Sequence, residues 1–206
     1  MLAKRIFDIV FSIIGIIILS PVFIIITLLI KIITPGPVFF SQYRTGQKGR
    51  LFKIYKFRTM ILNHGGDSIT IKNESRITPL GVVLRNYKLD ELPELLNIVK
   101  GDMSFVGPRP DTPEYTMLLA GEDRKILEIR PGITGPATLK YANEEELLAS
   151  SGDPKRYNDE VLWPDKVKIN LNYYYNRSFA GDIALIFRTI TRRFTKGNRR
   201  IDLLSN

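Results

Sequence analysis

Two adjacent carboxylates, Asp90 and Glu91, precede Pro93 in a segment rich in charged residues and turns. Proline is favoured in the first turn of a helix, so this spacing predicts that both acids lie beside a helix N-terminus, where anions are favoured. Such acids can hold Mg²⁺ or attack phosphorus, and neighbouring bases can hold phosphate oxygens, as phosphoryl transfer requires. The simpler alternative, which the pattern alone favours, is that the acids only stabilise the helix dipole.

Successive residues of a helix point about 100° apart, so adjacent carboxylates do not share one helix face. The order of the two acids therefore predicts two different roles rather than a pair that shares one proton. Five basic side chains are candidates for binding phosphate oxygens: Lys56, Arg58, Arg85, Arg109 and Arg130.

Two segments that carry these bases have simpler explanations as well. Arg130–Gly135, RPGITG, contains two glycines and a proline, which fix a loop whose backbone donors suit an anion. A plain tight turn explains this segment equally well. Lys56 and Arg58 lie in a basic run that a solvated strand explains equally well.

The composition excludes several classes of site. The chain has 206 residues, which fits one domain or one domain with an appendage, and is long enough to bury a core. It contains no cysteine, which excludes disulfides, zinc–thiolate sites, iron–sulfur clusters and thiol nucleophiles. His64 is the single histidine, so His-rich metal sites are excluded too.

The charge is unevenly distributed along the chain. The net charge is +9, with +8 over residues 1–66, zero over 67–110, −6 over 111–165 and +7 over 166–206. Basic ends suit either nucleic acid or an anionic membrane surface. The apolar segment near the N-terminus favours the membrane.

That segment, Ile6–Ile33, has 28 residues and only two charges, Asp8 and Lys31. A membrane-embedded helix is the default interpretation of such a run. A signal peptide fits poorly, because the apolar stretch is too long and no cleavage site of small residues follows.

Ser20-Pro21 lies in the middle of the apolar segment and predicts a break in the helix. The halves Ile6–Leu19 and Val22–Ile33 are roughly 21 and 18 Å long, and neither crosses a hydrocarbon core of about 30 Å. Both flanks are basic, and basic residues prefer the cytoplasmic side. We therefore predict a re-entrant membrane helix over 1–34 and a catalytic domain over 35–206; an ordinary span with a tolerated kink is the alternative.

The remaining chain is predicted to be mainly helical with one short β-hairpin, an α+β fold. Val38–Phe40 and Leu51–Tyr55 are predicted strands around a turn at Gly46–Gly49. Asn63–Asn73 and Ser150–Trp163 are predicted loops. Helices are predicted over Leu80–Tyr87, Glu94–Lys100, Glu114–Ile129, Asn143–Ala149, Val167–Tyr175 and Ile183–Phe194.

The last predicted helix is amphipathic, with apolar residues on one stripe and arginines elsewhere. This pattern suits a helix at an anionic bilayer surface. A core-facing helix with a solvated basic face is the alternative.

Motifs along nearly the whole chain resemble those of the small monotopic phosphoglycosyl transferases of the bacterial sugar transferase family. Each is weak alone, but together and in this order, after a membrane segment, they are specific. They are Ser20-Pro21, Phe52–Met60 (FKIYKFRTM), Arg85 with Leu89–Pro93 (LDELP), Lys100–Ser104 (KGDMS), Val106–Pro110 (VGPRP), Arg130–Gly135 (RPGITG) and the spaced residues Tyr173, Ser178, Asp182 and Thr189.

The resemblance implies an enzyme that transfers a phospho-sugar from a UDP-sugar to a polyprenol phosphate and releases UMP, the first membrane step of glycoconjugate assembly. It implies that Asp90 is the nucleophile of a covalent aspartyl-phosphosugar, with Glu91 as its partner. It also implies a required Mg²⁺, which we expect Asp90 and Glu91 to hold. The enzyme is expected to be monotopic at the cytoplasmic face of the bacterial inner membrane, with anionic lipids and no nucleic acid as partners.

The chain departs from the family pattern after Gly135. Many members continue with Trp-Ala-Gln-Val-Asn-Gly-Arg, but here Pro136–Tyr141 reads PATLKY and an acidic run, Glu144–Glu146, follows. These departures leave the sugar open. The chain also lacks the additional transmembrane domain of larger relatives and is expected to be the minimal catalytic form.

Three rival functions remain open at the level of sequence. The basic ends suit a membrane-anchored protein that binds nucleic acid or anionic lipid without turnover. The acidic pair suits a Mg²⁺-dependent hydrolase of lipid or nucleotide diphosphates. A transferase that works in one step, without a covalent enzyme, is the third rival.

Overall fold

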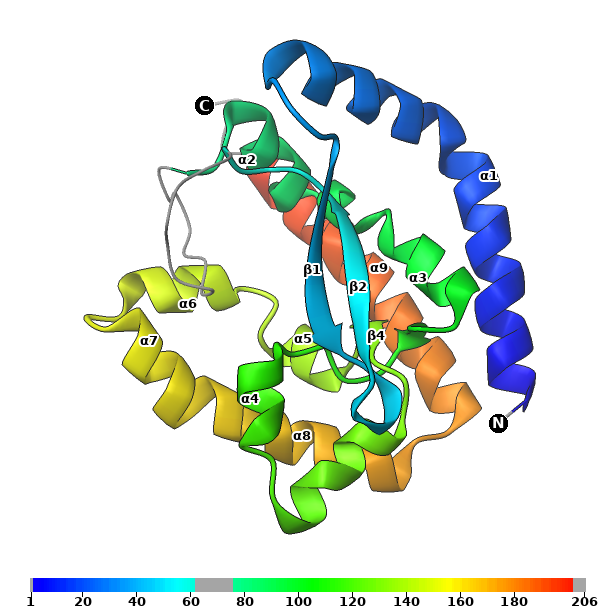
Figure 1. The fold of residues 1–206 in the computed structure, drawn as a ribbon, viewed down its shortest axis with the longest axis vertical. Helices are drawn as coiled ribbons and strands as arrows, with labels where there is room; N and C mark the ends of the chain where they lie inside the picture. Colours follow the sequence, from blue (N-terminus) through cyan, green and yellow to red (C-terminus); the bar gives the residue numbers. More distant parts are fainter. Residues whose placement is uncertain (1, 62–75, 202–206) are drawn as a thin grey trace.

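A long helix, α1 (Leu2–Ile33), runs along one side of the molecule, and a two-stranded hairpin crosses its centre (Figure 1). The computed structural model describes residues 2–61 and 76–201. The predicted loop Asn63–Asn73 lies outside these residues. The described part is mostly helical with two small sheets, so the predicted mainly helical α+β class is confirmed.

Helix α1 is continuous through Pro21, so the structure does not confirm the predicted break at Ser20-Pro21. Proline has no backbone N–H, which leaves the carbonyl of Ile17 without its usual helical donor. The Ser20 hydroxyl donates to this carbonyl at 2.8 Å, which keeps it bonded. The helix bends gradually along its length (Figure 1).

Among the described residues, α1 alone is long and apolar enough to cross a membrane, by length and composition only. Its 32 residues span about 48 Å at 1.5 Å per residue. Many of its apolar side chains point away from the protein; Ile17 and Ile18 are 66% and 68% exposed. An exposed apolar surface of this extent is typical of a segment that contacts lipid.

The predicted hairpin is confirmed. Strands β1 (Phe39–Thr45) and β2 (Leu51–Phe57) pair antiparallel, with Phe39 opposite Phe57 and Thr45 opposite Leu51. A second, parallel pair was not predicted: β3 (Ser104–Val106) lies beside β4 (Gly132–Thr134). These strands have three residues each, too few for a periodic signal.

Five predicted helices are confirmed. They are α2 (Pro79–Asn86), α3 (Glu94–Lys100), α6 (Glu144–Ser150), α8 (Trp163–Asn176) and α9 (Phe179–Ile201). Of these, α2, α3 and α6 agree with the predicted bounds within one residue, whereas α8 begins four residues earlier and α9 is longer at both ends. A short additional helix, α5 (Pro136–Lys140), lies in the segment where the sequence departs from the family pattern.

Two predictions in the second half of the chain are wrong. The single helix Glu114–Ile129 is split into α4 (Pro113–Met117) and a 3₁₀ helix, Gly121–Glu128. The chain leaves the helical path between them, because Ala120 is extended and Gly121 has a φ of 50°. The predicted loop Ser150–Trp163 is largely helical instead. It contains a short helix, α7 (Pro154–Tyr157), which Asp153 caps by accepting a hydrogen bond from Arg156 N at 3.0 Å. A π-helical turn then connects α7 to α8.

Two apolar clusters join α1 to the rest of the protein. The first connects the second half of α1 with the hairpin and α2, and the second connects β2 with α3 under the first half of α1. Their buried members are Ile26, Ile30, Val38, Phe57 and Leu84 in the first, and Phe52, Ile54, Leu95, Ile98 and Met103 in the second. The helix is therefore packed on the folded domain along both halves. The division at residue 34 stays a prediction.

Candidate active site

The two predicted acids lie in a tight turn between α2 and α3. After α2 the backbone turns through Lys88, at φ 56°, and then forms a short 3₁₀ helix, Leu89–Glu91, that leads through Pro93 into α3. Asp90 is 7% exposed and Glu91 is 6% exposed. The sequence spacing therefore placed both acids correctly, immediately before a helix.

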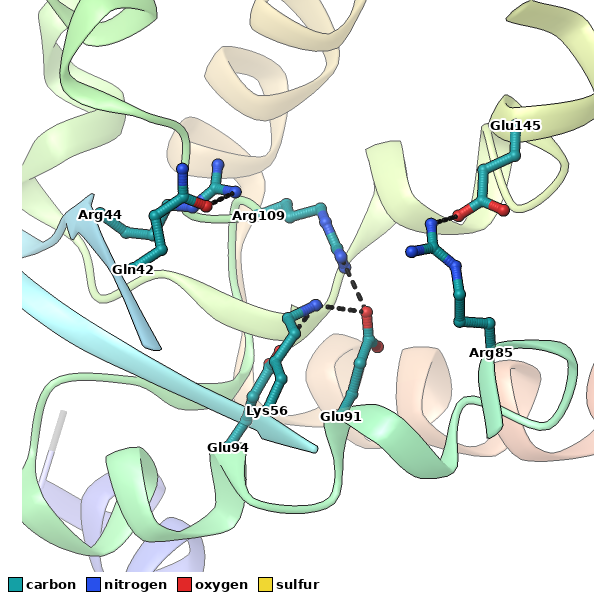
Figure 2. Close-up of polar contacts among 8 residues, drawn as sticks. All are labelled: Gln42, Arg44, Lys56, Arg85, Glu91, Glu94, Arg109 and Glu145. Atoms are coloured by element: carbon teal, nitrogen blue, oxygen red, sulfur yellow. Dashed lines mark hydrogen bonds and ion pairs between the residues drawn. The ribbon is translucent and has the colours of Figure 1, made fainter. Parts of the chain in front are cut away.

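Glu91 is held by two cations. Its Oε1 accepts from Lys56 Nζ at 2.9 Å and from Arg109 Nη2 at 2.7 Å (Figure 2). Burial alone would raise the pKa of Glu91, but Arg109 and Lys56 together hold that pKa well below its usual range. Glu91 is therefore a fixed anion at neutral pH.

Asp90 has the opposite environment. Its Oδ1 is buried and has no hydrogen-bond partner among the described residues. Burial and the neighbouring Glu91 raise the pKa of Asp90, although Lys56 and Lys88 oppose this shift. The environments of the two carboxylates thus differ: cations neutralise Glu91, and Asp90 has an oxygen without a partner among the described residues. Two different roles stay a prediction.

A third acid, Glu94, was not predicted as part of the site. It is 1% exposed, and its Oε1 lies 3.2 Å from Lys56 Nζ without a well-aligned hydrogen bond. Burial raises its pKa to about 7 despite the attraction of Lys56. The spacing in the sequence could have indicated this third acid. Glu94 follows Glu91 by three residues and Asp90 by four, and residues at these spacings lie on the same face of a helix.

The five predicted phosphate-binding cations divide into two groups. Lys56 and Arg109 contact Glu91, and Arg85 pairs with Glu145 at 2.6 Å beside them (Figure 2). The other two donate to backbone carbonyls. Arg58 donates to Thr34 O at 2.6 Å and to Pro35 O at 2.9 Å, and Arg130 donates to Gly101 O at 2.9 Å.

These bonds give the guanidinium groups of Arg58 and Arg130 structural roles. Arg58 satisfies carbonyls at the end of α1, where helical partners run out. Arg130 ties the segment before β4 to the turn after α3. Phosphate binding by either residue stays a prediction.

Two further cations near the site, Lys88 and Arg44, were not among the five candidate phosphate-binding residues. Lys88 is one of two non-glycine residues with positive φ in the described structure, and its side chain makes no hydrogen bond or ion pair there. Arg44 lies beside Arg109 and donates to Gln42 Oε1 at 2.7 Å (Figure 2). Unusual backbone conformations at non-glycine residues cluster at functional sites, which makes Lys88 the more informative of the two.

Asn97 fixes α3 against the hairpin. It is fully buried, accepts from Tyr55 N at 3.1 Å, and donates to Lys53 O at 2.7 Å and Asp102 Oδ2 at 3.2 Å. Because Tyr55 precedes Lys56 in β2, this side chain sets the distance between Lys56 on the hairpin and the acids before α3.

The Gly107–Pro110 loop brings Arg109 to the same acids. A Cβ at Gly107 would lie 2.3 Å from Arg130 O, so only glycine allows this close approach of the two backbones. Gly107 N also donates to Thr134 O at 2.9 Å. The β3–β4 pair therefore positions Arg109 through backbone contacts.

The acids provide only part of a metal site. No group of three or more acidic or histidine side chains in the described part of the chain is arranged to hold a metal ion. Mg²⁺ is commonly bound by one or two carboxylates with substrate phosphates and water, and the unpaired Asp90 Oδ1 fits such a ligand. Glu91 Oε1 fits less well, because two cations already contact it.

Comparison with known proteins identifies the family of the chain. The model of the bacterial sugar transferase family matches residues 1–196. An exopolysaccharide production protein, ExoY, of Sinorhizobium fredii is 33% identical, covering 92% of this chain and 84% of the relative. The exopolysaccharide production protein PSS of Rhizobium leguminosarum is 36% identical, covering 94% and 96%.

The UDP-glucose:undecaprenyl-phosphate glucose-1-phosphate transferase of Escherichia coli is 34% identical and covers 94% of this chain, which matches 40% of that longer relative. The family match extends over both α1 and the acid-bearing turn. This chain therefore belongs to the bacterial sugar transferase family.

Proposed function

We propose that this protein transfers a phospho-sugar from a UDP-sugar to a polyprenol phosphate, with Asp90 as a covalent nucleophile. The observation that carries the proposal is the unpaired, buried oxygen of Asp90 beside a glutamate that two cations hold. Buried polar atoms without partners are rare, and they occur where a ligand or reaction partner belongs. The names of the relatives supply the two substrate classes.

The reaction takes two displacements. In the first, an Asp90 carboxylate oxygen attacks the phosphorus that carries the sugar, the new P–O bond forms, and the phosphoanhydride bond breaks with its bridging oxygen leaving on UMP. In the second, a phosphate oxygen of the polyprenol phosphate attacks the same phosphorus. The bond to Asp90 breaks, the carboxylate is restored and a polyprenyl-diphospho-sugar is released. Two unlike substrates can thus use one site in turn.

The surrounding residues support these displacements electrostatically. A carboxylate needs no general base to attack phosphorus, but it must meet a diphosphate that is itself negative. Lys56, Lys88 and Arg85 act on Asp90 with positive charge, and Arg109 adds a cation on the neighbouring Glu91. Figure 2 shows Lys56 and Arg109 on Glu91, with Arg85 to the side. Fixed cations that need not reorganise are the main source of catalysis in phosphoryl transfer.

A magnesium ion completes the proposed site. Asp90 would hold it through its free oxygen, together with donor phosphates, and Glu91 would take part only if it released a cation. When bound, Mg²⁺ neutralises charge on the diphosphate. Mg²⁺ dependence is part of the proposal.

The contacts of α1 support a re-entrant, monotopic arrangement. Near its start, Lys4 pairs with Asp182 and donates to Val106 O at 3.0 Å, and Arg5 donates to Ile98 O at 2.7 Å. Near its end, Thr34 O accepts from Arg58. Both ends of α1 are thus bonded to one folded domain, as expected if both lie on the same side of the bilayer.

The proposed side is the cytoplasmic face of the bacterial inner membrane, because both flanks of α1 are basic. The chain has no cysteine, so single cysteines at Leu2 and Leu51, which are 77% and 57% exposed, can report on each flank. An impermeant thiol reagent applied to intact cells is expected to label neither position. Labelling at one position only would contradict the re-entrant arrangement.

The reaction is tested by UMP release from a panel of UDP-sugars with Mg²⁺, with and without polyprenol phosphate. We expect multiple turnovers only with acceptor and with a preferred sugar. In the absence of acceptor, label from the sugar phosphate should stay on the protein. Steady release without acceptor would favour a hydrolase, and acceptor-dependent release without labelling would favour a one-step transfer.

A further inference from the structure

The acidic helix α6 contacts a predicted cation of the active site through Glu145. Glu145 Oε1 lies 2.6 Å from Arg85 Nη2, and the two side chains are 35% and 17% exposed. Figure 2 shows this pair beside the group formed by Lys56, Glu91 and Arg109. Glu145, in the acidic run that departs from the family pattern, therefore forms an ion pair with a cation beside the catalytic acids.

Arg85 is well placed to bind a substrate phosphate. It lies in the last turn of α2, five residues before Asp90, and its charge lowers the pKa of Asp90 against the larger effect of burial. A guanidinium group binds carboxylates and phosphates with the same planar set of donors. A carboxylate on Arg85 thus occupies the donors that a phosphate would use.

We infer that Glu145 competes with the donor's diphosphate for Arg85, so that α6 limits the affinity of this enzyme for its nucleotide-sugar. The inference rests on the proposed function. Binding of the diphosphate exchanges one anion for another on Arg85, and the released Glu145 turns to water, which its partial exposure allows.

The remaining contacts of α6 explain how this exchange can occur without unfolding the helix. Glu144, at the start of α6, pairs with Lys166 on α8 at 2.6 Å. Leu148 is 2% exposed, so the helix is also anchored by an apolar side chain. Release of Glu145 therefore leaves α6 attached to α8 and to the core.

The opposite role for Glu145 makes an opposite prediction. If the carboxylate instead holds Arg85 in the position that binds phosphate, its removal leaves Arg85 disordered and weakens binding. Competition and positioning thus differ in the sign of one measurement, the affinity of the Glu145→Gln protein for a diphosphate.

The experiment is calorimetric titration of the full-length protein in detergent with UDP, without acceptor. We expect UDP to bind Glu145→Gln about 2- to 5-fold more tightly than wild type, the range that one partly exposed ion pair provides. Asp165→Asn is the matched control, because Asp165 pairs with Lys140 at the same 2.6 Å and is also 35% exposed. It should bind UDP like wild type.

A second pair of variants tests whether Arg85 mediates the effect. In an Arg85→Gln background, adding Glu145→Gln should change UDP affinity by less than it does in the wild-type background. The same gain in both backgrounds would mean general charge repulsion and would overturn the inference. Equal or weaker binding by Glu145→Gln, or no binding of UDP to either protein, would overturn it as well.

Turnover separates this inference from the proposed function. With a donor that the enzyme uses, Glu145→Gln should lower KM by a similar factor and leave kcat nearly unchanged, since Glu145 does not contact the reacting atoms. If UDP binding tightens while no UDP-sugar releases UMP, the competition stands and the proposed reaction fails. If turnover is normal and neither KM nor UDP affinity changes, the reaction stands and the competition fails.

Discussion

Two groups of polar side chains, each built around buried acids, differ in how completely those acids are paired. The anchoring group joins the start of α1 to β3, α8 and α9, and the catalytic group joins β2 to the turn before α3. The members are Lys4, Asp8, Tyr173 and Asp182 in the anchoring group, and Lys56, Asp90, Glu91, Glu94 and Arg109 in the catalytic group.

In the anchoring group, the acids have donors. Asp182 accepts from the Tyr173 hydroxyl at 2.6 Å and pairs with Lys4, while Asp8 accepts from Phe105 N at 3.2 Å. In the catalytic group, Asp90 Oδ1 and Glu94 Oε1 lack hydrogen bonds within the described structure. A satisfied network holds elements together, whereas an unsatisfied one is costly and is retained where a ligand completes it.

The largest effect is expected for Asp90→Asn. Removing the nucleophile should lower UMP release about 10³-fold or more and abolish covalent labelling, while stability should not fall, because an unpaired buried carboxylate is replaced by a neutral group. Thermal unfolding of the same preparation serves as the control. A fully active Asp90→Asn protein would remove Asp90 from the role of nucleophile.

The anchoring group should show the reverse behaviour. Asp182→Ala leaves Lys4 and the Tyr173 hydroxyl without their partner, and we expect the free energy of unfolding to fall by about 3 kcal/mol. Specific activity of the folded fraction should fall far less than for Asp90→Asn. The control, Asp165→Asn, removes a more exposed pair and should cost at most about 1 kcal/mol. An unchanged melting temperature of Asp182→Ala would contradict the contrast between the groups.

Local signals explain what could be predicted from the sequence. Helix α3 has the predicted bounds, Glu94–Lys100, because Pro93 precedes it and Gly101 ends it. The hairpin followed from two apolar runs around a glycine turn. The position of Asp90 and Glu91 followed from the same proline, since the sequence itself marks where the helix begins.

Contacts between distant segments explain what could not be predicted. The β3–β4 pair joins Ser104 to Gly132, and no local pattern marks such a pairing. Likewise, the basic residues of the motifs look alike in sequence, yet Arg109 contacts Glu91 while Arg58 contacts the carbonyl of Thr34. Only the folded structure shows which backbone carbonyls need a hydrogen-bond donor and which carboxylates need a cation beside them.

The pH dependence of the free energy of unfolding tests the effect of burying Glu94 in the catalytic group. The pKa of Glu94 is raised to about 7 in the folded protein, so its contribution to stability is complete below the ordinary glutamate pKa and is lost as the pH rises through about 7. Between pH 5 and pH 8, wild type should therefore lose on the order of 1–3 kcal/mol relative to Glu94→Gln. Denaturant unfolding at both pH values measures this difference.

Glu160→Gln is the control for that comparison, because Glu160 forms an exposed pair with Arg156. Its difference from wild type should stay constant with pH. If the difference in unfolding free energy between Glu94→Gln and wild type is also constant with pH, burial of the Glu94 carboxylate does not destabilise the folded protein. The contrast with the anchoring group would then be weaker than proposed.

The smallest effect concerns Lys88, which adopts a left-handed backbone beside the acids and has no ion pair in the described structure. Asparagine tolerates this conformation better than lysine, so Lys88→Asn removes the charge without disturbing the turn. Lys48, at φ 58° in the hairpin turn, is a matched control with the same backbone and no acid pair beside it. Both variants should be as stable as wild type or slightly more so.

Only Lys88→Asn should lose activity, by about 10-fold, the effect of removing one charge-assisted contact to a phosphate. Lys88→Arg, which keeps the charge, should recover most of that loss. Initial rates at subsaturating donor measure both changes. Equal activity of the Lys88 and Lys48 variants would mean that the strained turn serves only to aim Asp90 and Glu91, and that the catalytic group is complete without a further cation.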